Sequence, residues 1–201
     1  DCETRAVAYS DCGKMPLPSY SLAKSMIGAL GLMRLEKLYP GTQHRRVKDL
    51  IPDCNDWGEV TLSHLLNTST GRYGSALNHR DEEQHVGKLL AKPSAASKTK
   101  FACNLYKAKS EPGEKWVYHT SDTWLLGVAM QSLWQQKKGP TADFYTDLIN
   151  PIWHDLGLSP VIQSPHRQDG QPLTGLGLSF LRSVPRFRPS ISEALVWLLR
   201  V

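Results

Sequence analysis

The chain lacks long apolar runs, and it has too little glycine and proline for a fibrous or low-complexity protein. Its longest apolar runs, residues 125–130 and 194–199, are far shorter than the roughly 18 residues of a membrane span. The 15 glycines and 13 prolines among 201 residues stay well below the roughly 25–30% that marks low-complexity chains. A chain of this length buries about 70% of its unfolded surface, so it needs no metal or disulfide scaffold. These absences leave a globular domain.

Cysteine and histidine are present, but they do not form the usual metal or redox motifs. Cys2, Cys12, Cys54 and Cys103 allow three pairings and fit neither zinc spacing nor C-x-x-C. Buried thiols and disulfides therefore both remain open. None of the seven histidines forms H-x-x-x-H, and no G-x-S-x-G elbow occurs. The sequence thus argues against a metal site and against an α/β-hydrolase.

Positive charge is in modest excess and is scattered along the chain. The sequence has 24 Lys and Arg against 19 Asp and Glu, which gives a net charge of +5. Its densest basic groups lie at residues 44–48, 137–138 and 182–188. No aromatic residues are interleaved with them to form a base-stacking platform. We expect a solvated basic surface and no nucleic-acid partner, with binding of a polyanion as the weakest alternative.

The apolar spacing predicts a chain rich in helix with little continuous strand. We expect helices over residues 21–38, 62–67, 123–137, 142–150 and 191–200, with surface loop and short helices over 72–113. The first is apolar on most sides, which indicates burial. Thr61 is the predicted cap of the second helix, and Ser121 or Asp122 is the predicted cap of the third.

Ser21 and Lys24 are three residues apart at the start of the first predicted helix. This spacing puts both side chains on one face. Unpaired N–H groups and the helix dipole favour negative charge at this terminus, as on a serine alkoxide or a tetrahedral oxyanion. Burial favours the neutral form of a lysine, which can then take the proton of a serine. The pair indicates a nucleophile with its base, although S-x-x-K also arises by chance and Ser21 also suits an ordinary N-cap.

Three further stretches accompany this motif in a set order. Residues 60–71 read V-T-L-S-H-L-L-N-T-S-T-G, residues 112–127 read P-G-E-K-W-V-Y-H-T-S-D-T-W-L-L-G, and residues 152–158 read I-W-H-D-L-G-L. Together with S-x-x-K they resemble the superfamily of serine β-lactamases, penicillin-binding proteins and related esterases. The nearest subgroup in pattern is the class C β-lactamase-related one, which includes carboxylesterases and 6-aminohexanoate-dimer hydrolases. The resemblance implies an α+β fold of the β-lactamase/transpeptidase type, mainly its helical part with an incomplete antiparallel sheet.

The resemblance also implies roles for residues in the 112–127 stretch. Tyr118 takes the place of the second catalytic residue, which passes a proton between Ser21 and the leaving group. Thr120 stands where the family usually has Asn, so it binds substrate without a bidentate amide. Ser121 is an alternative proton shuttle, because Ser121-Asp122-Thr123 imitates a Ser-Asp-Asn motif. The alternative for Tyr118 is a purely structural role, in which its ring packs between this segment and a helix.

The chain departs from the family in its last motif. Leu173-Thr174-Gly175 has two letters of the Lys-Thr-Gly or His-Thr-Gly strand but lacks the cation, and the resemblance ends after Ser179. In the family that strand supplies the second oxyanion N–H. We therefore expect residues 1–201 to form one β-lactamase-related domain that is partial, without the N-terminal strands and this C-terminal strand.

The resulting expectation is a serine hydrolase that cleaves an ester or amide of a small molecule through an acyl-enzyme. A β-lactam or a 6-aminohexanoate oligomer are examples, and no metal or organic cofactor is required. The alternative is a catalytically inactive, truncated homologue that acts as a ligand-binding or protein-interaction module. The resemblance favours a secreted or periplasmic location, and the sequence leaves the oligomeric state open.

Overall fold

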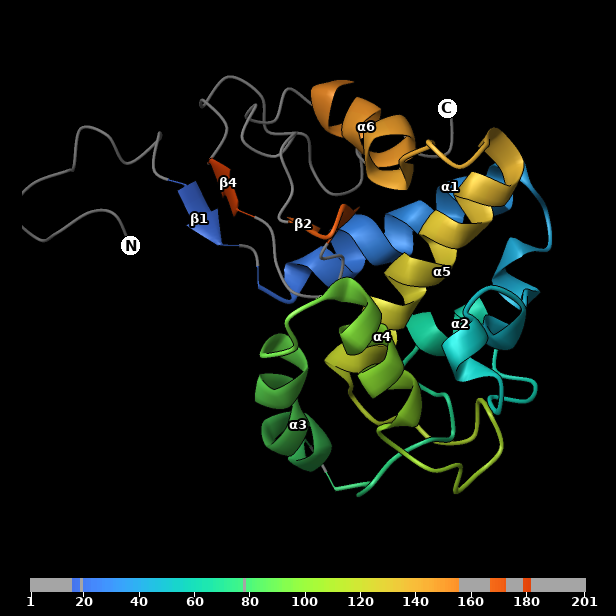
Figure 1. Ribbon diagram of the computed structural model, residues 1–201, viewed down its shortest axis with the longest axis vertical. Helices are drawn as coiled ribbons and strands as arrows, with labels where there is room; N and C mark the ends of the chain where they lie inside the picture. The colour runs from blue at the N-terminus through green and yellow to red at the C-terminus, as the bar shows by residue number, and fades with distance from the viewer. Residues whose placement is uncertain (1–15, 19, 78, 156–166, 173–178, 182–201) are drawn as a thin grey trace, which may run out of the picture.

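The computed structural model describes residues 16–18, 20–77, 79–155, 167–172 and 179–181 (Figure 1). Its α-helices are α1 (Leu30–Leu38), α2 (Leu62–Leu66), α3 (Arg80–Leu90), α4 (Ala95–Asn104), α5 (Thr120–Lys138) and α6 (Asn150–Asp155). π-helical segments over Lys24–Ala29 and Tyr145–Ile149 lead into α1 and α6. Single 3-10 turns lie at Thr42–His44, Val47–Asp49 and Pro52–Cys54. None of the helices over these residues is long and apolar enough to cross a membrane.

Strand is scarce among the described residues and forms two short antiparallel pairs. β1 (Pro16–Pro18) pairs with β4 (Ser179–Leu181), and β2 (Arg167–Gln168) pairs with β3 (Gln171–Pro172). The predicted predominance of helix is therefore confirmed. The two pairs do not establish a larger sheet, so the α+β class with an incomplete sheet stays a prediction.

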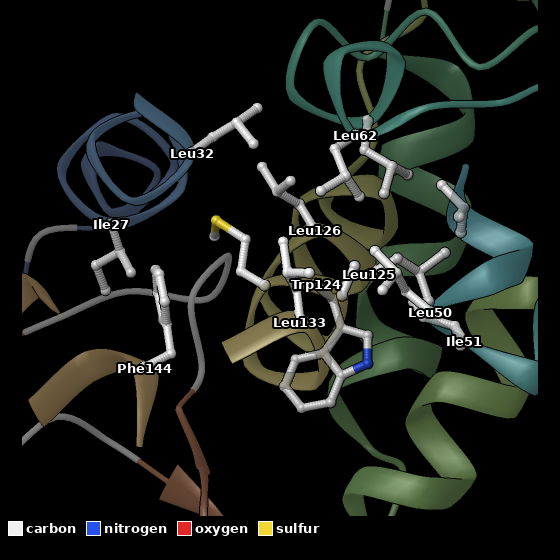
Figure 2. Close-up of a cluster of buried hydrophobic side chains, with 14 of the residues drawn as sticks. Ile27, Leu32, Leu50, Ile51, Leu62, Trp124, Leu125, Leu126, Leu133 and Phe144 are labelled. Atoms are coloured by element: carbon white, nitrogen blue, oxygen red, sulfur yellow. The ribbon is translucent and has the colours of Figure 1, made fainter. Parts of the chain in front are cut away.

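Helix α5 runs through the centre of the described structure and forms the middle of the core (Figure 1). It has no polar face over most of its length, which is the pattern of a helix buried on all sides. Figure 2 shows its neighbours: Ile27, Leu32 and Phe144 approach from one side, and Leu50, Ile51 and Leu62 from the other. Each fully buried side chain of this size contributes about 1.5–3 kcal/mol. Packing of this density fixes the position of α5 closely.

The first predicted helix is confirmed as a continuous helical segment over residues 22–38, part of it π-helical. Close packing against the segment before α6 explains one of its glycines. A Cβ atom at Gly31 would overlap the ring of Phe144. The predicted cap of α2 is also confirmed, because Thr61 Oγ1 accepts from the His64 backbone N–H and His64 Nδ1 accepts from the Thr61 N–H.

The predicted start of α5 is wrong. The helix begins at Thr120 with His119 as N-cap, so Ser121 and Asp122 lie inside its first turn and do not cap it. The physical reason is an acceptor from another element: a carboxylate oxygen of Glu82 on α3 takes the Thr120 N–H at 2.8 Å. A helix terminus whose N–H group is satisfied in this way does not need a local cap. The helix predicted over residues 142–150 is displaced as well, since helical structure there runs from residue 144 to 155. The helix predicted over residues 191–200 lies outside the described residues.

A disulfide joins the turn before residue 55 to helix α4. Cys54 and Cys103 are bonded, and Trp57 Nε1 donates to the Cys103 carbonyl at 2.9 Å beside them. Of the thiols and disulfides that the sequence leaves open, Cys54 and Cys103 therefore form a disulfide. Cys2 and Cys12 lie outside the described residues. The bond closes a long loop that contains α2 and α3.

A buried polar cluster holds the residue before α5. His119 Nε2 lies 3.2 Å from Asp81 Oδ2 on α3, and its other nitrogen, Nδ1, lies 3.5 Å from Asp122 Oδ2. The Tyr106 ring stacks on the imidazole with centroids 4.5 Å apart. Burial lowers the pKa of His119, but pairing with Asp122 and Asp81 outweighs burial and leaves this pKa raised. Burial raises the pKa of Asp122, partly offset by His119.

We expect loss of the disulfide to destabilise the fold. The bond has a sequence separation of 49 residues, and cross-links of this kind contribute about 2–4 kcal/mol by restricting the unfolded chain. The double variant Cys54→Ala, Cys103→Ala should lower the free energy of unfolding by this amount in urea. An unchanged urea midpoint in the double variant would contradict the structural role given to the bond.

The His119 cluster predicts a pH dependence of stability. A folded-state pKa above the unfolded value gives stabilisation that is complete below about pH 6.5 and is lost as pH rises through the folded pKa. Asp122→Asn removes the larger source of the upward shift, so the pKa of His119 should fall and the loss of stability should begin at lower pH. NMR titration of the imidazole C–H and urea unfolding across pH measure the two effects. His154→Gln, at an exposed histidine, is the control.

Candidate active site

Three side chains that the sequence singled out meet at the start of the first helical segment. Ser21 directly precedes helical residue 22, and Lys24 opens the π-helical stretch one turn later. Lys24 Nζ lies 3.3 Å from Ser21 Oγ. Tyr118, from the segment before α5, brings its hydroxyl to 2.8 Å from the same Ser21 oxygen. Lys24 Nζ also lies 5.1 Å from the centroid of the Tyr118 ring. A serine oxygen is thus within hydrogen-bond reach of both an amine and a phenol.

Thr120 contacts the same lysine. Its hydroxyl oxygen lies 3.0 Å from Lys24 Nζ, so it completes a polar rim around the amine. The threonine side chain is buried, whereas Ser21 is exposed and Lys24 and Tyr118 are half-buried. Thr120, which the resemblance assigns only to substrate binding, therefore contacts the lysine that is predicted to be the base.

Ser121 takes a different position. It is buried in the first turn of α5, next to the buried Asp122. The hydroxyl group that contacts Ser21 is that of Tyr118. Of the two predicted proton shuttles, Tyr118 is thus the one whose hydroxyl group contacts Ser21.

Glu82 belongs to the site and was missed by the sequence reasoning. One carboxylate oxygen accepts the Thr120 N–H at 2.8 Å, and the other accepts the Thr120 hydroxyl. The stretch 72–113 has little apolar pattern, so its elements were not located. A usable signal was present, because three consecutive acidic residues, Asp81, Glu82 and Glu83, form the first turn of α3.

An apolar pocket adjoins the Tyr118 ring. It has a volume of about 470 Å³ and is lined by Ala76, Leu77, His79, Trp116, Val117 and Tyr118. His79 contacts the Tyr118 ring edge-on at 5.4 Å between centroids, and the Trp116 centroid lies at 6.4 Å. Leu77 and Trp116 remain 62% and 58% exposed, so this apolar surface faces outward. Tyr20 and Leu22 on either side of Ser21 are exposed in the same way.

Backbone strain coincides with this region. Tyr20, directly before Ser21, has φ +45°, and His79, against the Tyr118 ring, has φ +56°. Side chains other than glycine rarely adopt this left-handed conformation, which costs on the order of 1–3 kcal/mol. Such strain persists where the surrounding structure imposes it, and it clusters at functional sites.

The described residues give no sign of a metal centre and leave the last family motif open. No group of three or more His, Cys, Asp or Glu side chains within the described ranges is placed to hold a metal ion. Leu173-Thr174-Gly175 lies outside these ranges, so the absence of a Lys-Thr-Gly-type strand stays a prediction.

Comparison with solved structures supports a fold of the β-lactamase-like type. No family model and no curated protein matches the sequence. The structure is similar to one titled "Putative 6-aminohexanoate-dimer hydrolase from Bacillus anthracis", with a TM-score of 0.58 and 15% identity, over 83% of this chain and 44% of that chain. The chain therefore spans less than half the length of that protein. At this identity the likeness concerns the fold alone, and that fold is of the β-lactamase/transpeptidase-like type.

Proposed function

We propose that the protein is a serine hydrolase that cleaves ester or amide bonds through an acyl-enzyme on Ser21. The observation that carries the proposal is the position of Ser21 Oγ, 2.8 Å from the Tyr118 hydroxyl and 3.3 Å from Lys24 Nζ. A nucleophile with its base in hydrogen-bond reach, and a third group that orients the base, is the recurring arrangement of covalent catalysis. Thr120 is that third group here.

The chemistry follows from these contacts. Ser21 Oγ attacks the carbonyl carbon while its proton passes to the neutral amine of Lys24. Tyr118 donates its hydroxyl proton to the leaving oxygen or nitrogen and recovers a proton from Lys24. The bond to the leaving group then breaks and the acyl group stays on Ser21. Water attacks this ester, loses a proton to the same pair, and releases the acid, with Ser21 reprotonated.

The surroundings of the nucleophile favour an apolar acyl or alkyl group on the substrate. The pocket beside Tyr118 is lined largely by apolar side chains, and exposed Tyr20 and Leu22 extend the apolar surface on both sides of Ser21. A substrate whose carbonyl reaches Ser21 would bury part of this surface, with about 0.8 kcal/mol for each CH2 group removed from water. A β-lactam or a 6-aminohexanoate oligomer belongs to the wider class of amides that the same chemistry covers.

Acylation at Ser21 is the direct test. Intact mass after incubation with a p-nitrophenyl ester or a fluorescent penicillin should show an adduct, and Ser21→Ala should abolish it. Lys24→Ala and Tyr118→Phe should each lower kcat at least about 100-fold, the scale of general acid–base catalysis. Ser25→Ala, at an exposed serine one turn along the same helix, should behave as the parent.

Absence of any Ser21-dependent adduct or turnover would remove the hydrolase proposal. Saturable binding of the penicillin without an adduct would then support the inactive ligand-binding homologue.

The apolar pocket predicts a preference among esters. The kcat/KM for p-nitrophenyl hexanoate should exceed that for the acetate, because the longer chain buries more apolar surface. Trp116→Ala or Leu77→Ala should reduce this ratio about tenfold, and Leu90→Ala, at an exposed leucine on the far end of α3, should leave it unchanged. Equal ratios in all variants would place the acyl chain elsewhere.

A further inference from the structure

Glu82 commits both of its carboxylate oxygens to one residue. Oε2 accepts the Thr120 backbone N–H at 2.8 Å, and Oε1 accepts the Thr120 hydroxyl. The acceptor comes from α3 and the donors from the first residue of α5. The contact is half-buried, so it is protected from much of the competition by water.

This contact determines which way the next hydrogen bond points. An ionised carboxylate only accepts, and a hydroxyl has a single proton to donate. With that proton directed at Glu82, Thr120 Oγ1 presents only lone pairs to Lys24 Nζ, 3.0 Å away. Lys24 must therefore be the donor in its contact with Thr120.

The direction matters for a lysine that acts as a base. A neutral amine has two protons and one lone pair. When one proton is given to Thr120, the lone pair is left for the hydroxyl proton of Ser21, whose oxygen lies 3.3 Å away. If the Thr120 hydroxyl were free to turn, it could donate into the lone pair and occupy the base.

We infer that Glu82 is a positioning residue that acts through Thr120 to keep the lone pair of Lys24 directed at Ser21. The inference rests on the proposed hydrolase function. When the Ser21 proton arrives on Lys24, the new ammonium donates to Thr120, whose hydroxyl is already polarised by the carboxylate. Glu82 thus supports both the neutral and the protonated form of Lys24, and it does so through Thr120, the group that orients the base.

A purely structural role for Glu82 is less consistent with the neighbouring contacts. Asp81, the preceding residue of α3, already ties this helix to the same segment, since it accepts from the Gly74 and Ser75 N–H groups at 2.7 and 2.8 Å and pairs with His119. The docking of α3 therefore has an anchor that a change at Glu82 leaves in place.

Glu82→Gln is the test, because it keeps the size of the side chain and one oxygen for the Thr120 N–H but replaces the other oxygen by an NH2 donor. The full chain is labelled with a fluorophosphonate, which reads the reactivity of Ser21, and assayed with a p-nitrophenyl ester. We expect labelling and kcat to fall about 10- to 100-fold with KM within twofold. Glu83→Gln, at the exposed neighbouring residue, should match the parent.

The second part of the test changes the hydroxyl group of Thr120. Thr120→Ser keeps it and should stay within about threefold of the parent, whereas Thr120→Val should be at least tenfold slower. Glu82→Gln added to Thr120→Val should have less than a twofold effect, since the hydroxyl that Glu82 orients is gone. Non-additivity of this kind separates action through Thr120 from a general loss of structure. If Glu82→Gln does not fold, Glu82→Ala replaces it in both backgrounds, because Asp81 still anchors α3.

Each outcome has one meaning. Parent-like labelling of Glu82→Gln, equal rates for the two Thr120 variants, or an unchanged effect of Glu82→Gln in the Thr120→Val background would overturn the inference and leave the hydrolase proposal standing. Failure of the parent protein to label at Ser21 would overturn both.

Discussion

The position of the first turn of α5 is the constraint on which the site depends. Below that turn the helix is surrounded by apolar side chains, so it cannot shift without opening cavities in the core. Tyr118, just before this turn, contacts Ser21, and Thr120, its first residue, contacts Lys24 at the start of the other long helical segment. The packing of these two helical segments therefore brings the hydroxyl groups of Ser21 and Tyr118, 97 residues apart in the sequence, to 2.8 Å from each other.

Helix α3 secures this arrangement with two consecutive carboxylates that have different partners. Asp81 is buried with the imidazole of His119, and Glu82 reaches the hydroxyl and the N–H of Thr120. Because these partners are also consecutive, the entry into α5 is held at two points. Burial of such groups is costly unless each is paired, so the cluster also restricts the alternative positions that the segment can take. The strained backbones of Tyr20 and His79 lie next to this rigid part, where the surrounding contacts can sustain them.

The helical core could be predicted closely, but the entry into α5 could not. Residues 22–38 follow the predicted range, and Thr61 caps α2 as expected, because apolar periodicity and capping are local properties of the sequence. The start of α5 was placed three residues late because Glu82, 38 positions away, supplies the acceptor that replaces a cap. Helix α3 falls within residues 72–113, where short helices are predicted without bounds, because its residues are mostly polar and only Asp81 and Leu89 are buried.

The sequence by itself determined the residue types of the site: a serine and a lysine one turn apart on a buried helix, and a tyrosine within a stretch that resembles a known motif. A periodic pattern is sufficient for this, since it places neighbours along one helix. Only the tertiary structure decided that the Tyr118 hydroxyl contacts Ser21, that Cys54 pairs with Cys103, and that Glu82 accepts hydrogen bonds from Thr120. These contacts join elements that are distant in the sequence, and they form only when the whole core packs. They therefore produce no periodic pattern in the sequence from which they could be predicted.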